Sequence, residues 1–238
     1  MVFDKLESIL QAVSDVGIDE IIIEPVGEKS LIRGTNSDNL IILFDHVGTK
    51  LFDHDIAIQG VKSFLSRIRL FDKDKVKLET ELRNGDSTYI SVLHLKQGRR
   101  KTTFRMGNPK SIHTVTHAPG VDNIAASFKL SKADIEKMLR EIQSIGQTGS
   151  AIEQTITFQA ENGEVHYSLY NGEDDKFDDK IQTDVDSFDP VVYDMKNFTR
   201  VLRKSLDVKK DEVEVKLIEI MALRFDMGDV DVILAPIG

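Results

Sequence analysis

The sequence has no cysteine and no long apolar run, and each absence excludes a class of protein. Without cysteine there is no disulfide, no thiolate metal site and no cysteine nucleophile, which fits a reducing compartment. The longest segments free of acidic and basic residues span roughly ten residues, short of the ~20 that a membrane helix needs. Charged residues follow Met1 almost at once, at Asp4, Lys5 and Glu7, so no signal peptide is expected.

Sequence motifs of common enzyme classes are also missing. The chain has no GxxxxGK[ST] loop, no GxGxxG fingerprint and no GxSxG nucleophile elbow. His113 and His117 have the i, i+4 spacing of a helical metal pair, but Pro119 and the threonines around them disfavour a helix. The acidic residues at 173–179 lack the spacing and the glycine of a calcium loop. We therefore expect no catalytic centre, no metal and no other cofactor.

The charge of the chain is unevenly distributed. Its 238 residues carry a formal charge of −9, which at first argues against nucleic-acid binding. Residues 1–120 nevertheless hold 17 basic against 16 acidic residues, and residues 121–238 hold 14 against 24. With 40% hydrophobic residues, the chain is long enough for one large domain or two of about 120 residues. The two halves therefore differ in charge, and the next question is whether they repeat.

The helical pattern of the first half recurs in the second. The first apolar stripe consists of Leu6, Ile9, Leu10, Val13 and Val16. A shift of 129 residues reproduces it as Ile135, Met138, Leu139, Ile142 and Ile145. Gly17 and Gly146 follow as helix stops. Ser131 and Asp134 have the spacing of a capping box before the second of these helices.

A second pair of helices and the strands around them extend the repeat. Residues 55–68 correspond to residues 189–202 at an offset of 134, and each segment precedes an alternating strand. These strands contain Val76, Leu78 and Thr80 in the first half and Val213, Val215 and Leu217 in the second. Further short strands are expected at 21–23, 40–44, 90–95, 156–158 and 165–170, with a type I′ turn at Asn162-Gly163.

Each half is thus predicted to read strand, helix, several strands, helix, several strands. Residues 108–123 contain two prolines and a glycine and have no sustained periodicity, so we interpret them as a connector. The predicted fold class is α+β, with one domain at 1–107 and a similar one at 124–238.

The second helix of each half carries only basic charge. No aspartate or glutamate occurs at 56–71 or at 195–205. The basic residues there are Lys62, Arg67, Arg69, Lys196, Arg200, Arg203 and Lys204. An exposed basic face is ordinary for a surface helix, but its occurrence in both helices favours contact with phosphates. Of the first helices, the one at 135–145 adds Lys137 and Arg140, whereas acidic residues make the N-terminal helix a poor phosphate contact.

Two further segments have opposite charge. Arg99, Arg100, Lys101 and Arg105 lie near the end of the first half, and acidic residues cluster at 173–179 in the second. The acidic run is also compatible with a solvated loop or with an unrecognised hydrolase. A positive edge and a negative edge nevertheless suit a head-to-tail contact between copies, which closes into a ring where the rotation permits.

The C-terminal segment reads Asp226-Met227-Gly228 and then Val232 through Ile237, VILAPI. With the duplicated helix–strand pattern, it resembles the DNA sliding clamps of the two-domain type, namely proliferating cell nuclear antigen and the clamps of T4-like phages. The resemblance implies a homotrimeric ring of six domains in which helices line a central hole. It also implies a cytoplasmic or nucleoid-associated location. The divergence of the sequence favours a phage source, for which the location would be the host cytoplasm. The implied partners are double-stranded DNA, a DNA polymerase and an ATP-dependent clamp loader.

The resemblance also implies three groups of site residues. The channel would be lined by Lys62, Arg67, Arg69, Lys137, Arg140, Lys196, Arg200, Arg203 and Lys204. The subunit interface would hold Arg99, Arg100, Lys101 and Arg105 against Asp174, Asp175, Asp178 and Asp179. Partner peptides would dock on Leu40, Ile112, Val115, Pro119, Val121, Leu234, Ala235, Pro236 and Ile237, residues that are otherwise ordinary core or loop. The alternative to a clamp is an adaptor of the same fold that acts only through protein contacts.

Overall fold

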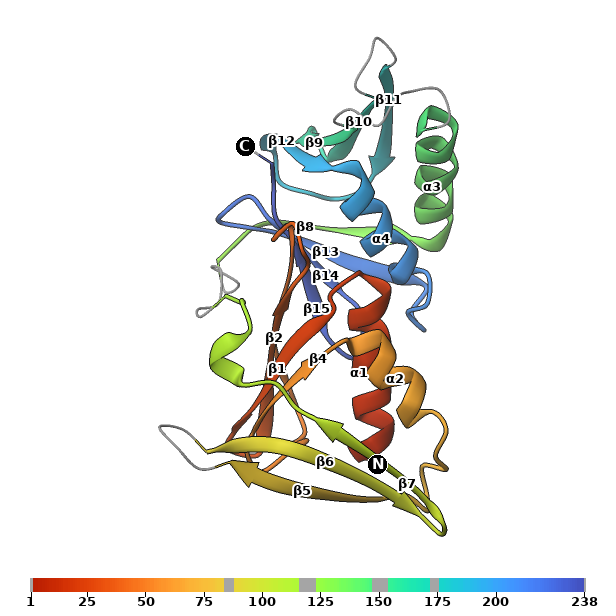
Figure 1. The fold of residues 1–238 in the computed structure, drawn as a ribbon. Coiled ribbons are helices and arrows are strands. Elements are labelled where there is room, and N and C mark those ends of the chain that lie inside the picture. The colour runs from red at the N-terminus through yellow and green to blue at the C-terminus, as the bar shows by residue number, and fades with distance from the viewer. Residues whose placement is uncertain (1, 84–87, 116–122, 147–153, 172–175, 238) are drawn as a thin grey trace. The chain divides into compact units, whose positions relative to one another are not determined.

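The computed structural model describes residues 2–83, 88–115, 123–146, 154–171 and 176–237. Within them the chain forms two compact units (Figure 1). The first comprises Met1–Asp38 and Leu43–Thr116, and the second comprises Asn39–Ile42 and His117–Gly238. No helix in the described ranges is long and apolar enough to cross a bilayer.

The first unit contains two helices and seven strands in its described part. In chain order these are α1 (Val2–Asp15), β1 (Glu20–Val26), β2 (Lys29–Thr35), β3 (Ile41–Val47), β4 (Asp55–Gln59), α2 (Val61–Ile68), β5 (Lys77–Arg83), β6 (Tyr89–Gln97) and β7 (Arg100–Arg105), followed by a short 3-10 helix (Pro109–Ser111). The strands are ordered β5-β6-β4-β1-β2-β3, and β7 pairs with β6. Helices α1 and α2 pack against each other on one side of the strands (Figure 1).

The second unit repeats this plan. Its elements are β8 (Ile124–Ser131), α3 (Lys132–Gly146), β9 (Thr155–Glu161), β10 (Glu164–Tyr170), β11 (Lys176–Gln182), β12 (Phe188–Asp194), α4 (Met195–Ser205), β13 (Glu212–Ile218), β14 (Leu223–Asp226) and β15 (Asp231–Leu234). One group of strands is ordered β11-β10-β9-β12 and the other β15-β14-β13-β8. Helix α3 packs on α4, which contacts strands of both groups.

The strand order confirms the duplication inferred from the sequence. In the first unit β4-β1-β2-β3 are neighbours, and in the second β12-β9-β10-β11 have the same order and the same sequence positions. Likewise β5, β6 and β7 form a meander that β13, β14 and β15 repeat. The predicted fold class, two similar α+β units with two helices each, is therefore correct.

The predicted apolar stripes form the core of each unit. Leu6, Ile9, Leu10 and Val13 on α1 are at most 1% exposed, and Ile135 and Met138 on α3 are fully buried. The predicted capping box also forms, because Asp134 N donates to Ser131 Oγ (3.1 Å) and Ser131 N donates to Asp134 Oδ2 (3.0 Å). Asn162 and Gly163 both have positive φ, as a type I′ turn between β9 and β10 requires.

The first unit differs from the second in two ways. Every residue of β5, the strand expected at Leu78 and Thr80, is exposed, whereas Val213, Val215 and Leu217 on β13 are buried. The strand expected before the first helix is absent among the described residues, although a strand, β8, leads into α3. These two differences are related, because β8 pairs with β13 and covers its far edge.

Candidate nucleic-acid interface

Helix α2 separates its apolar and basic residues on opposite faces. Gly60 at φ 67° turns the chain into the helix, a left-handed conformation that favours glycine. Val61, Phe64, Leu65 and Ile68 are buried, and Lys62 and Arg67 are exposed on the other side. The Arg67 guanidinium lies 5.8 Å from the ring centre of Phe104, a cation–π contact that orders the side chain without cancelling its charge.

Helix α4 repeats this arrangement with more positive charge. Asp194 caps the helix by accepting from Asn197 N at 2.7 Å, and Phe198, Val201 and Leu202 are buried. Lys196 and Arg203 are exposed and form no ion pair with any described residue. The remaining two cations are half-buried: Arg200 donates to Asn197 Oδ1 at 3.4 Å, and Lys204 pairs with Asp207 at 3.1 Å.

Arg69 follows α2 and is tied to α1, which the sequence did not indicate. Its Nε lies 2.9 Å from Glu7 Oε1, and its Nη2 donates to Gln11 Oε1 at 2.5 Å. Lys73 pairs with Asp4 on the same helix at 2.9 Å and holds the pKa of that carboxyl below its ordinary value. The acidic face of α1 therefore neutralises neighbouring cations, so Arg69 is a weaker phosphate contact than its exposure suggests.

Helix α3 and strand β11 share a cluster of charged groups. Lys137, predicted for the channel, forms an ion pair with Asp179, predicted for the subunit interface. Tyr167 on β10 donates to Glu141 Oε2 at 2.5 Å, with Asp179 Oδ2 at 3.4 Å. Lys137 lowers the pKa of Asp179. Burial and the charge of Asp179 raise the pKa of Glu141, although the hydrogen bond from the Tyr167 hydroxyl acts in the opposite direction. Burial and the neighbouring carboxylates raise the pKa of Tyr167.

Lys137 and Asp179, predicted for two different sites, meet in this ion pair, so the charge of Lys137 is compensated within the chain and its role in a channel stays a prediction. Arg140, on the same helix, is exposed and forms no ion pair with any described residue. Glu141 and Tyr167 were missed, since a single tyrosine within an alternating strand carries no signal of such a contact. Of the predicted channel residues, those that are exposed and form no ion pair with a described residue are Lys62, Arg67, Arg140, Lys196 and Arg203.

The two predicted edge segments lie on strands with one open side. Strand β7 pairs only with β6, and β11 pairs only with β10, among the described residues. Arg99, Lys101 and Arg105 are exposed and form no salt bridge with any described residue, and Arg100 donates to Leu70 O at 3.0 Å. The β7 edge therefore carries positive charge, and its role in a subunit interface stays a prediction.

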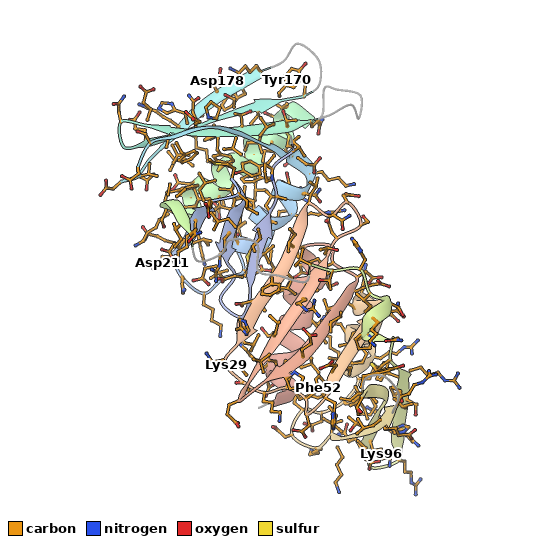
Figure 2. All side chains as sticks on the ribbon, turned by 90° about the vertical axis from the view of Figure 1, so that its left-hand side faces the viewer. Lys29, Phe52, Lys96, Tyr170, Asp178 and Asp211 are labelled. Carbon is orange, nitrogen blue, oxygen red and sulfur yellow. The ribbon has the colours of Figure 1, made fainter. Side chains whose placement is uncertain are left out.

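At the β11 edge, the two described residues of the predicted acidic group are both engaged in ion pairs. Asp178, labelled in Figure 2, pairs with Lys176 at 3.0 Å and accepts from Ser168, which lowers its pKa. Asp179 is engaged by Lys137, and Asp174 and Asp175 lie outside the described residues. Strand β11 also does not correspond to β7 in the repeat, because it matches β3 whereas β7 matches β15.

The residues predicted to bind partner peptides fall into two groups. Leu40 belongs to the second unit, where its carbonyl accepts from Ala235 N at 2.8 Å, and Ile237 N donates to Val192 O at 2.9 Å. Leu234 is buried, and Pro236 is half-buried. Ile112 and Val115 belong to the first unit, and Pro119 and Val121 lie outside the described residues. The structure therefore assembles the C-terminal part of this surface, and the complete pocket stays a prediction.

In the first unit the start of the connector is fixed to strands β1, β2 and β4. Ile112 is buried against Ile22 and Ala57. Arg33 donates two hydrogen bonds of 2.7 Å to the Glu24 carboxylate, from Nε and Nη2. Its Nη1 donates to Val115 O at 3.0 Å. No local pattern in the sequence indicates this contact, which joins residues 82 positions apart.

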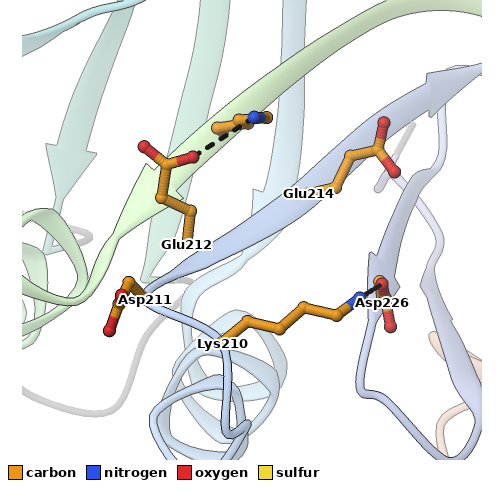
Figure 3. A pocket seen from close by; sticks show the side chains of 6 residues that line it. Lys210, Asp211, Glu212, Glu214 and Asp226 are labelled. Carbon is orange, nitrogen blue, oxygen red and sulfur yellow. Dashed lines mark hydrogen bonds and ion pairs between the residues drawn. The ribbon is translucent and has the colours of Figure 1, made fainter.

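A cavity of about 630 Å³ beside β8, β13 and β14 is lined by charged side chains (Figure 3). It is lined by Lys129, Lys210, Asp211, Glu212, Glu214 and Asp226. Burial alone would raise the pKa of Asp226, but Lys210 at 2.5 Å and the Gly228 amide hold it below its ordinary value. Lys216 likewise lowers the pKa of Glu214. Paired carboxylates of low pKa are poor general acids.

Comparison with solved structures identifies the architecture. A chain of the PCNA2–PCNA3 complex from Sulfolobus tokodaii aligns over 99% of this chain and 97% of its own length, with a TM-score of 0.63 and 16% identity. Proliferating cellular nuclear antigen from Entamoeba histolytica aligns over 100% of this chain and 96% of its own length, with a TM-score of 0.66 and 12% identity. A chain in the structure of the C-terminal region of FEN-1 bound to A. fulgidus PCNA aligns over 100% of this chain and 97% of its own length, with a TM-score of 0.67 and 14% identity. The chain has the fold of the DNA sliding clamps.

The clamp fold spans essentially the whole chain, which is what the C-terminal resemblance implied. No family model and no curated protein matches the sequence. At 12–16% identity the likeness concerns the fold, and the charge distribution of this chain carries the argument about function. Among the described residues, no three histidine or acidic side chains are arranged as metal ligands.

Proposed function

We propose that this protein is a sliding clamp that encircles duplex DNA and tethers a DNA polymerase to it. The observation that carries the proposal is the unpaired positive charge on the second helix of both units. Lys62 and Arg67 on α2 and Lys196 and Arg203 on α4 are exposed and free of ion pairs in the described part of the chain. In a chain of net charge −9, this pattern supports contact with phosphates in a clamp-fold channel.

The free edges of β7 and β11 support ring formation by head-to-tail contact. In the repeat, β15 corresponds to β7, and β3 corresponds to β11. Within the second unit, the backbone just after β15 already bonds to the residues that lead into β3, through Ala235 N and Leu40 O at 2.8 Å. An equivalent backbone contact between β7 of one copy and β11 of the next would join three chains into a closed ring of six domains.

The mechanism of such a clamp is topological. A closed ring stays on DNA without tight contacts, so exposed lysines and arginines that are screened by salt allow it to slide. A polymerase held on the ring has a high effective concentration at the primer end and dissociates less often. The chain itself hydrolyses nothing in this scheme, and an ATP-dependent loader opens the ring.

Partner proteins would bind to the C-terminal segment and the connector. A. fulgidus PCNA is seen with the C-terminal region of FEN-1, and a polymerase tail is the equivalent occupant proposed here. The segment from Leu234 to Ile237 joins Leu40 in the second unit, and Ile112 and Val115 anchor the connector in the first. An apolar anchor residue of the partner would provide most of the affinity.

Two measurements test this function. Light scattering over a range of salt and protein concentrations is expected to give a mass near three chains, and Lys101→Glu with Arg105→Glu is expected to lower it. A strict monomer or a twofold dimer at high concentration contradicts the ring. Lys196→Glu with Arg203→Glu is expected to keep the mass but abolish stimulation of the polymerase from the same organism. The exposed Lys209→Glu is the matched control, and stimulation that survives the double reversal favours a protein adaptor.

A further inference from the structure

Strand β5 presents an open edge and an apolar row that no described residue covers. It pairs with β6 along one side only, and all of its residues are exposed. Leu78 stands opposite the buried Leu95, and Leu82 stands opposite the buried Ile90. These two leucines therefore continue the core-facing side of β6, yet their side chains are 37% and 43% exposed.

The second unit shows how the same place in the repeat is completed. Strand β13 corresponds to β5, and its core-facing residues Val213, Val215 and Leu217 are at most 1% exposed. Strand β8 lies antiparallel along its far edge and places Leu130, Phe128 and Ala126 opposite these three residues. The edge is thus completed by an extended segment with apolar residues at alternate positions, which is the geometry of strand addition.

The charges beside β5 are the reverse of those beside β13. In the second unit Lys129 of β8 stands opposite Glu214 and forms an ion pair with Glu212 at 3.3 Å. With the offset of 137 residues that relates the two strands, Lys77 takes the place of Glu214. The side chain of Lys77 is exposed and forms no ion pair or hydrogen bond with any described residue.

The two acidic residues of β5 do not compensate this charge. Glu79 is paired with Lys96, which is labelled in Figure 2, and Lys96 lowers its pKa. Glu81 lies 2.7 Å from His94 Nε2. Both acids are therefore engaged by β6, whereas the side chain of Lys77 is not engaged by any described residue.

We propose that β5 binds an extended acidic peptide of a partner protein by strand addition. The peptide lies antiparallel to β5 and places apolar side chains on Leu78 and Leu82 and a carboxylate opposite Lys77. Its backbone forms hydrogen bonds with the free edge, its alternate apolar residues cover the exposed leucines, and its acidic residue pairs with Lys77. The surface lies on the first unit and is separate from the C-terminal segment proposed for polymerase tails.

The experiment uses three fluorescein-labelled synthetic peptides and the full-length protein. The first peptide has the sequence of Ile124–Ser131 with Lys129→Glu, the second has the unaltered sequence, and the third is the first with Phe128→Ser and Leu130→Ser. Fluorescence anisotropy is expected to show binding of the first, about threefold to tenfold weaker binding of the second, and none of the third. Amide hydrogen exchange at 77–83 is expected to slow when the first peptide is bound.

Charge reversal on the protein makes the test specific. Lys77→Glu is expected to invert the preference, so that the unaltered peptide binds better than its acidic form. Lys209 of the second unit is also exposed, and Lys209→Glu is expected to leave the preference unchanged. Equal affinity of the first two peptides for both proteins, or exchange at 77–83 that no peptide slows, overturns the proposal. Protection at 77–83 that rises with protein concentration alone also overturns it, because the occupant is then a second copy.

Discussion

Lys137 on α3 and Asp179 on β11 form an ion pair that joins a helix with a predicted DNA-facing role to a strand with a predicted subunit contact. In this pair Asp179 raises the pKa of Lys137, and Lys137 lowers the pKa of Asp179. The lysine therefore stays charged, but its charge is compensated within the chain. Arg140, one turn or less away on the same helix, is not compensated by any described residue.

Removing the acid of this pair is expected to strengthen DNA binding. In Asp179→Asn, Lys137 loses its counter-charge and becomes available to a phosphate, so binding to a short duplex tightens. The plot of log K against log salt is expected to steepen by about one for each additional phosphate contact. Asp178→Asn is the matched control, because Asp178 pairs with Lys176 on its own strand. An equal effect of the two variants would contradict the role assigned to Lys137.

Glu141 is expected to make stability depend on pH in the opposite direction to a paired carboxylate. Its pKa is raised in the folded state, so the folded state holds the proton more tightly than the unfolded state does. Ionisation of Glu141 therefore costs stability as the pH rises from its ordinary pKa through the raised value. Glu141→Gln can still accept a hydrogen bond from Tyr167. Its stability relative to the wild type is expected to rise across that pH window, and the difference is expected to stay constant at higher pH. Urea unfolding at several pH values measures this, and a difference that is constant with pH would contradict it.

Gly34 is expected to tolerate no side chain. A Cβ at this position would lie 2.8 Å from Glu20 O and 3.0 Å from a methyl carbon of both Ile18 and Ile21. Because the nearest atom is backbone, Gly34→Ala is expected to lower the free energy of unfolding by about 1–3 kcal/mol. Gly48→Ala, where a Cβ meets nothing within 4 Å, is expected to change it by less than about 0.5 kcal/mol. Chemical denaturation distinguishes the two, and equal stability of the variants would contradict the close approach at Gly34.

Tyr193 is expected to stabilise the turn between β13 and β14. Its hydroxyl donates to Met221 O at 2.7 Å, and Met221 has a positive φ of 59°, which is rare for a residue other than glycine. Tyr193→Phe leaves this carbonyl without its donor and is expected to cost about 1–2 kcal/mol. Tyr170→Phe, at a residue 41% exposed, serves as the control. Thermal unfolding measures both, and the same midpoint for the two variants would contradict a role for the hydroxyl.

Local patterns in the sequence determined the helices, their buried faces and the duplication. The stripe of α1 and its copy in α3, the capping box at Ser131 and the turn at Asn162-Gly163 all depend on residues a few positions apart, so the sequence displays them directly. The same is true of the basic faces of α2 and α4, because helical periodicity alone places Lys62 and Arg203 opposite the buried residues.

Only the tertiary structure decided which of these charges remain available. Arg69 is bound by Glu7, 62 residues away, and Lys137 by Asp179 on a distant strand, so the charge count of a helix face overstates its free charge. Tertiary structure also decided that β5 is exposed, because a strand with the alternation of β13 is buried only where another strand, such as β8, lies along its edge. Alternation reports which side of a strand is apolar, whereas burial and charge pairing depend on neighbours that the local sequence does not specify.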